Sequence, residues 1–87
     1  MVKKELLKKY GNEEEIKKAI EEKIANGDFI TTAEMVAVAK YLGYMDLYHK
    51  YSCYIELNTQ YGTTPYDIYI DMINDIYTDK NIILTRL

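Results

Sequence analysis

Residues 31–43 read TTAEMVAVAKYLG, and this stretch decides how the rest of the chain can pack. Only Glu34 and Lys40 are charged within it, so apolar side chains surround nearly the whole circumference of a helix. Such a helix is buried on most sides in a folded domain. Thr31 and the glutamate three residues later form a capping box that predicts the helix start, and the closing glycine predicts its end. We therefore expect a central helix over residues 33–42.

Two further helices are predicted before this segment. The first, from Val2 to Tyr10, is rich in lysine and ends at Gly11. The second begins after Asn12, which forms a capping box with Glu15, and it closes at Gly27 as a C′ residue. Its apolar stripe is narrow and contains Ile16, Ala19, Ile20 and Ile24.

The segment after the central helix, from Met45 to about Thr59, is ambiguous. Its larger apolar side chains recur at the helical period, on the face that carries Leu47, Tyr48, Tyr51, Tyr54 and Ile55. Residues 54–61 also alternate between polar and apolar and have high β-propensity. A helix is the favoured interpretation, with a short strand as the alternative.

A clear helix start follows at Thr64, where a capping hydroxyl precedes Pro65 at the first helical position. We expect this helix to reach Asp79. Its apolar residues would cover an arc of roughly 200° that includes Tyr66, Ile68, Tyr69, Ile70, Met72, Ile73, Ile76 and Tyr77. The tail, residues 81–87, is apolar and is predicted to be either a docked segment or an edge strand.

These elements predict an all-α fold, a compact bundle of four or five short helices in a single domain spanning residues 1–87. A short β element near residues 54–61 or in the C-terminal tail is the open alternative. The single cysteine, Cys53, excludes an internal disulfide, and no charged-then-apolar leader follows Met1. We therefore expect a cytoplasmic protein with no membrane association.

One cluster of charge stands out, a ladder of four aspartates at spacing four: Asp67, Asp71, Asp75 and Asp79. No lysine or arginine occurs between Lys50 and Lys80. Like charges four residues apart on a helix destabilise it by a few tenths of a kcal/mol per pair, about 0.2–0.5. The ladder is either a solvated outer face or a surface whose carboxylates stay unpaired within the chain because they meet a positively charged partner.

The chain is also polarised along its length. Residues 1–10 carry a balance of +3, whereas residues 44–79 carry a balance of −5. Such asymmetry influences association and the choice of partner rather than the fold. The candidate partner-binding residues are therefore Asp67, Asp71, Asp75, Asp79, Asn74, Tyr66, Glu56 and Asp46.

Catalysis is not expected from this sequence. It has one histidine, one cysteine, no nucleophile elbow and no glycine-rich phosphate loop, so no acid–base or nucleophile pair can be proposed and no cofactor is expected. Asp46, His49 and Cys53 share one helix face, and all three residue types bind zinc, but the chain has no other histidine or cysteine for a fourth ligand. We expect no metal site.

Two other binding functions remain open. The central helix, the Gly43-Tyr44 joint and the following helix could form a helix-turn-helix regulator of DNA. Its would-be recognition helix carries Asp46 where phosphates should be met, and a DNA reader needs a basic footprint. The ten tyrosines, which exceed what one small core usually needs, could instead serve a self-associating structural or adaptor module, including a homodimer.

A short, tyrosine-rich chain with a one-signed acidic helix resembles the small inhibitors that phages and mobile elements direct at host defence nucleases. Anti-CRISPR proteins and other nucleic-acid mimics belong to this type. The resemblance is carried by the four aspartates of the ladder and by Tyr66, Tyr69 and Tyr77, about a third of the chain. It implies a non-enzymatic viral inhibitor whose acidic Asp/Tyr surface engages a basic groove of a nucleic-acid-handling protein.

Overall fold

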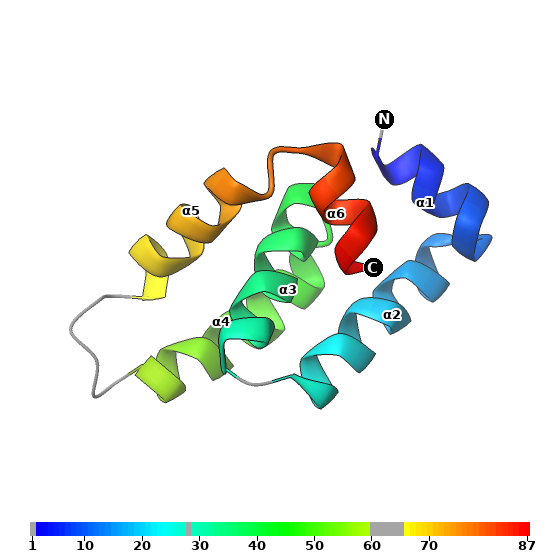
Figure 1. Ribbon diagram of the computed structural model, residues 1–87. Coiled ribbons are helices and arrows are strands. Elements are labelled where there is room, and N and C mark those ends of the chain that lie inside the picture. Colours follow the sequence, from blue (N-terminus) through cyan, green and yellow to red (C-terminus); the bar gives the residue numbers. More distant parts are fainter. Residues whose placement is uncertain (1, 28, 60–65) are drawn as a thin grey trace.

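The computed structural model describes residues 2–27, 29–59 and 66–87, with side chains throughout except at 29, 54–59 and 66–69 (Figure 1). These residues form six helices and no strand: α1 Val2–Tyr10, α2 Glu13–Asn26, α3 Phe29–Leu42, α4 Met45–Thr59, α5 Tyr66–Ile76 and α6 Lys80–Arg86. The all-helical fold is confirmed, with more helices than the four or five expected. The short β element was wrong for residues 54–59 and for the tail, which are helical, while residues 60–61 lie outside the described part.

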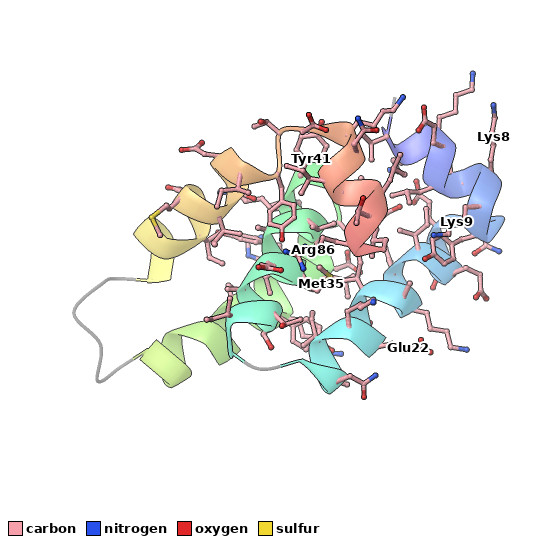
Figure 2. All side chains as sticks on the ribbon, in the orientation of Figure 1. Lys8, Lys9, Glu22, Met35, Tyr41 and Arg86 are labelled. Carbon is pink, nitrogen blue, oxygen red and sulfur yellow. The ribbon has the colours of Figure 1, made fainter. Side chains whose placement is uncertain are left out.

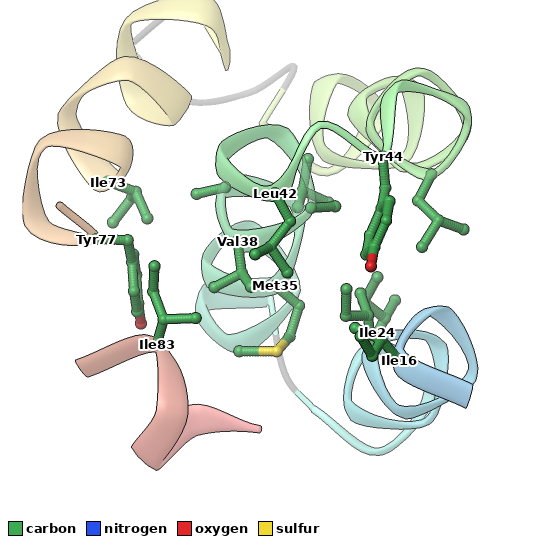
Figure 3. Close-up of a cluster of buried hydrophobic side chains, with 14 of the residues drawn as sticks. Ile16, Ile24, Met35, Val38, Leu42, Tyr44, Ile73, Tyr77 and Ile83 are labelled. Atoms are coloured by element: carbon green, nitrogen blue, oxygen red, sulfur yellow. The ribbon is translucent and has the colours of Figure 1, made fainter. Parts of the chain in front are cut away.

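The central position of α3 is confirmed. It passes through the middle of the molecule, with α5 on one side, α2 and α4 on the other and α6 across its front (Figures 1 and 3). Nearly all of its side chains between the second and last turns are buried: Thr32, Ala33, Met35, Val36, Ala37, Val38, Ala39 and Leu42. The largely apolar circumference of this helix therefore lets four neighbours pack on one short element.

The first two helices end and begin as predicted. Gly11 has φ 95°, and its N–H donates to the carbonyl of Leu7 at 2.7 Å. A left-handed glycine with this single hydrogen bond forms the αL motif that ends a helix. Asn12 then caps α2 by accepting a hydrogen bond from the N–H of Glu15 at 2.9 Å. The buried residues of α2 are those of the predicted stripe, Ile16, Ile20 and Ile24.

The junction of α2 and α3 differs from the prediction. Gly27 is extended, at φ −94°, so it is not a left-handed C′ residue. A β-carbon there would lie 2.4 Å from Cβ and Cγ2 of Thr31, so glycine is required by close packing. The helix starts at Phe29 and not after a Thr31 cap, and Thr32 is fully buried inside it. Packing of the first turn of α3 over the end of α2 has overridden the local capping signal.

The joint between α3 and α4 is a two-bond Schellman turn. Gly43 has φ 85° and donates its N–H to the carbonyl of Lys40 at 3.1 Å, while the N–H of Tyr44 reaches the carbonyl of Ala39 at 2.9 Å. The ambiguous segment that follows is a helix, so the favoured interpretation is confirmed. The turn directs Tyr44 into the space between α4 and α2 (Figure 3).

The last helix is the docked tail, not an edge strand. Ile83 is fully buried, and the hydroxyl of Tyr10 donates to the carbonyl of Leu87. Two ion pairs hold α6 to the rest of the molecule, Lys80 with Glu5 of α1 at 2.6 Å and Arg86 with Glu34 of α3 at 3.5 Å. The chain therefore closes on itself, with its C-terminal helix beside its first helix.

The basic first helix and the acidic helix α5 lie on different sides of the fold. The α1 helix, with Lys8 and Lys9 pointing outward, and α5 are on opposite sides of the molecule (Figure 2). No described helix combines the length and the apolar character that crossing a membrane requires.

Candidate functional site

The outer face of α5 is the part of the predicted site that the structure describes best. Ile70, Ile73 and Tyr77 turn inward and are at most 8% exposed. On the opposite side of the helix, Asp71 and Asp75 are exposed together with Met72 and Ile76, each 52% exposed. We refer to these four exposed residues as the α5 outer face.

Only part of the predicted apolar arc of this helix is buried. Ile70 and Tyr77 are the most buried of its described side chains, whereas Met72 and Ile76, at one edge of the arc, are exposed. Residues 72 and 76 follow each other by one turn, so they form a continuous apolar row beside the acidic one. The sequence alone does not distinguish the exposed Met72 and Ile76 from the buried isoleucines of the same helix.

The acidic ladder is shorter than predicted because α5 ends at Ile76. Asp79 lies beyond the helix and caps α6 instead, accepting a hydrogen bond from the N–H of Asn81 at 2.7 Å. Its carboxylate is therefore used within the chain. The side chains of Asp67, Tyr66 and Glu56 lie outside the described set, so their predicted role remains a prediction.

One carboxylate of the outer face is already paired, contrary to expectation. Asp71 accepts from the ammonium of Lys40 of α3 at 3.1 Å, with 69% of the aspartate side chain still exposed. An exposed pair of this kind contributes about 0–1 kcal/mol to stability. Among the described side chains, no lysine or arginine pairs with Asp75. The pair with Lys40 therefore leaves the outer face acidic but less so than the ladder suggested.

Two other predicted site residues are placed away from this face. Asp46 pairs with Lys17 of α2 at 3.1 Å, and that hydrogen bond is the main reason that the pKa of Asp46 is lowered and the pKa of Lys17 raised. Since α2 and α5 flank α3 on different sides, Asp46 does not join the α5 outer face (Figure 1). Asn74 is half-buried at the flank of α5, with no hydrogen-bond partner for its Oδ1 within the described structure.

The described tyrosines mostly build the core. Tyr44 and Tyr77 are at most 3% exposed, and burial is the main reason that the pKa of Tyr77 rises to about 12, with a hydrogen bond to Glu34 adding to it. Tyr10, Tyr48 and Tyr51 are half-buried against the core. Tyr77, which was expected to flank the ladder, is thus a core residue. Of the tyrosines with described side chains, Tyr41 alone is exposed, at 45%.

The helix-turn-helix alternative meets an obstacle in the packing of α4. In the first turns of α4, three side chains contact α2: Asp46 bonds Lys17, Lys50 lies 4.0 Å from Glu21, and Tyr51 donates to Glu21 at 3.5 Å. A recognition helix must present this end to the major groove of DNA. Here the same end is tied to another helix of the domain, and its one lysine is paired with an acid.

The three zinc-binding residue types noted in the sequence, Asp46, His49 and Cys53, all lie on α4. His49 and Cys53 are both exposed on α4, while Asp46 is turned toward Lys17. Within residues 2–27, 29–59 and 66–87, no group of three metal-ligating side chains comes together.

Searches against protein-family models, curated proteins and solved structures gave no match to the chain.

Proposed function

We propose that the chain is a non-enzymatic binding protein that docks the α5 outer face against a basic surface of a nucleic-acid-handling protein and thereby inhibits it. The supporting observation is the composition of that face: two exposed aspartates beside two half-exposed apolar side chains, on a helix whose other side is packed in the core. The resemblance to phage-encoded inhibitors of host defence nucleases points to the same class of target.

The electrostatics of the face support a basic partner. An acidic surface speeds the encounter with a basic one, and the rate then falls with ionic strength because salt screens the attraction beyond about 10 Å at 0.1 M. Basic grooves are common on proteins that hold nucleic acid, because such grooves must neutralise phosphates. The same acidic face would repel nucleic acid itself.

Exposed apolar side chains add a reason for a protein partner. Met72 and Ile76, one turn apart on the same row, are each 52% exposed. Burying such side chains against a partner stabilises a complex by about 25 cal/mol per Å² of apolar surface removed from water. A helix face that is only exposed to solvent gains no stability from these two apolar side chains.

Reversal of the acidic face tests the proposal. The chain with Asp71→Lys and Asp75→Lys is compared with the parent, and Glu14→Lys with Glu22→Lys serves as the control, because those two exposed acids lie on α2. Each variant is immobilised and used to retain proteins from a cell lysate. We expect the parent and the control to retain a nucleic-acid-binding protein that the reversed α5 variant loses.

The purified target then provides the functional measurement. Adding the parent chain should weaken binding of the target to nucleic acid in a gel shift, and adding the reversed variant should not. Equal retention by parent and reversed variant would show that the α5 carboxylates are only a solvated face. Steeply salt-dependent retention of the parent chain on a nucleic-acid column would favour the DNA regulator instead.

A further inference from the structure

The α5 outer face consists of two parallel rows, one acidic and one apolar. Asp71 and Asp75 form the first row, and Met72 and Ile76 form the second, each with one turn between its members. Residues four apart on a helix form a ridge, and the groove between two such ridges accepts a ridge of another helix at an interaxial distance of about 8–10 Å. The face is therefore shaped to pack against a helix.

Its charges are too sparse for imitation of nucleic acid. Residues one turn apart lie about 6 Å apart along the helix axis. Duplex DNA carries one charge per roughly 1.7 Å of its axis when both strands are counted. With Asp79 used as a cap and Asp71 shared with Lys40, the described side chains of α5 include one carboxylate without a basic partner, Asp75, and one partly neutralised carboxylate, Asp71. Charge alone therefore provides few contacts, and a basic partner surface also has to offer apolar side chains to Met72 and Ile76.

From these rows we propose that the α5 outer face binds an amphipathic basic helix of a protein partner, with apolar side chains packed on Met72 and Ile76 and lysine or arginine side chains against Asp71 and Asp75. This inference rests on the proposed function and names its partner element. Recognition of this kind uses anchors at helical spacing, as in other complexes that bind amphipathic helices.

A second copy of the chain is a poorer occupant on charge and shape. Its basic helix, α1, presents Lys4, Lys8 and Lys9 to solvent. Of the apolar side chains of that helix, Val2 and Leu6 are at most 6% exposed and Leu7 is half-buried against its own core. Helix α1 can therefore supply cations to the acidic row but little apolar surface to the second row. We therefore assign the partner helix to a separate protein.

Two synthetic peptides of equal charge test the inference. Each is roughly 18 residues long, about five helical turns. One carries leucine and lysine at helical spacing, and in the other every leucine is alanine, which keeps the helix propensity and removes the apolar ridge. Binding is measured by titration calorimetry at about 150 mM salt. We expect the leucine peptide to bind the parent chain at least about tenfold more tightly than the alanine peptide, since burial of a few CH₂ groups suffices for tenfold.

Matched variants locate the binding site. Met72→Ser with Ile76→Ser should weaken the leucine peptide about tenfold. The control pair is Met45→Ser with Ile30→Ser, because those side chains are 43% and 55% exposed on other helices. The control should bind as the parent does. With ¹³C-methyl methionine, the Met72 signal should shift on titration while the Met45 signal stays in place.

Three results would overturn the inference. Equal affinity of the two peptides would mean that charge alone is recognised, which leaves the proposed basic target intact. An unchanged affinity in the Met72 and Ile76 variant would place the peptide elsewhere. Sedimentation that shows a parent dimer which the Met72 and Ile76 substitutions dissociate would make the occupant a second copy. The proposed function fails on different results, such as a reversed α5 variant that still retains and inhibits the target.

Discussion

At the scale of single residues, the glycines show that one residue type serves two physical needs in this chain. Gly43 has a positive φ of 85° and open space around it, so its requirement is conformational. Gly27 has an ordinary φ of −94°, yet a β-carbon there would meet the side chain of Thr31 at 2.4 Å and the carbonyl oxygen of Lys23 at 2.9 Å. Its requirement is steric.

The two needs predict different responses to substitution. At Gly43, alanine should destabilise the fold by about 1–2 kcal/mol and asparagine by less, because asparagine tolerates the left-handed region. At Gly27, alanine should destabilise by about 1–3 kcal/mol through overpacking, and asparagine by at least as much. Urea unfolding of the four variants measures both differences. Equal losses for alanine and asparagine at Gly43 would contradict the conformational explanation.

At the scale of elements, α6 is the helix whose formation depends most on the rest of the molecule. It has seven residues, and an isolated helix shorter than about 12 residues is marginal in water. Its stability comes from the burial of Ile83, from the Tyr10 hydroxyl on the carbonyl of Leu87 and from its two ion pairs. The apolar tail of the sequence is therefore a docked helix because α1 and α3 offer it a surface.

Adjacent isoleucines on α6 test this dependence. Ile83→Ala should destabilise the domain by about 2–5 kcal/mol, because the side chain is fully buried in the core. Ile82→Ala removes the same atoms from a side chain that is 36% exposed, so its cost should be much smaller. Thermal and urea unfolding followed by circular dichroism give both values. A small cost at Ile83 would mean that α6 is dispensable for the fold.

At the scale of the whole molecule, ionisable groups link helices that are distant in sequence, so stability depends on pH at both ends of the range. The pKa of Glu5 is lowered chiefly by its hydrogen bond to Lys80, and the pKa of Asp46 by its hydrogen bond to Lys17. Unfolding releases these carboxylates to bind protons more readily. Stability from these pairs is therefore present above the ordinary carboxyl pKa and declines as pH falls through the lowered values.

At alkaline pH the dependence has the opposite sign, and the raised pKa values of Tyr77, Tyr44 and Lys17 all contribute to it. Burial, followed by the hydrogen bond to Glu34, raises the pKa of Tyr77 to about 12, while the unfolded side chain titrates near its usual pKa of 10.0. The folded state thus holds a proton that the unfolded state loses, and stability should fall between pH 10 and about 12. Urea midpoints measured across this range should fall less for Tyr77→Phe than for the parent. Tyr41→Phe, on an exposed ring, should follow the parent.

Local chemistry in the sequence determined most of the helices. The largely apolar circumference of residues 33–42 predicted the central helix, and the Asn12 capping box and the glycines at 11 and 43 predicted the ends of their helices correctly. These signals work because a cap or a positive φ depends on a few neighbouring residues. The helical class followed from the same evidence.

Tertiary packing alone decided the candidate surface. The sequence placed Asp79 on the acidic ladder and grouped Met72 and Ile76 with the other apolar residues of the helix, whereas the fold uses Asp79 as a cap and exposes Met72 and Ile76. The fold also pairs Lys40 with Asp71 and Lys17 with Asp46, residues that are far apart in the sequence and that no local pattern brings together. Periodicity fixes which side chains share a helix face. Which face turns inward depends on the shapes of the neighbouring helices, and that information is not local.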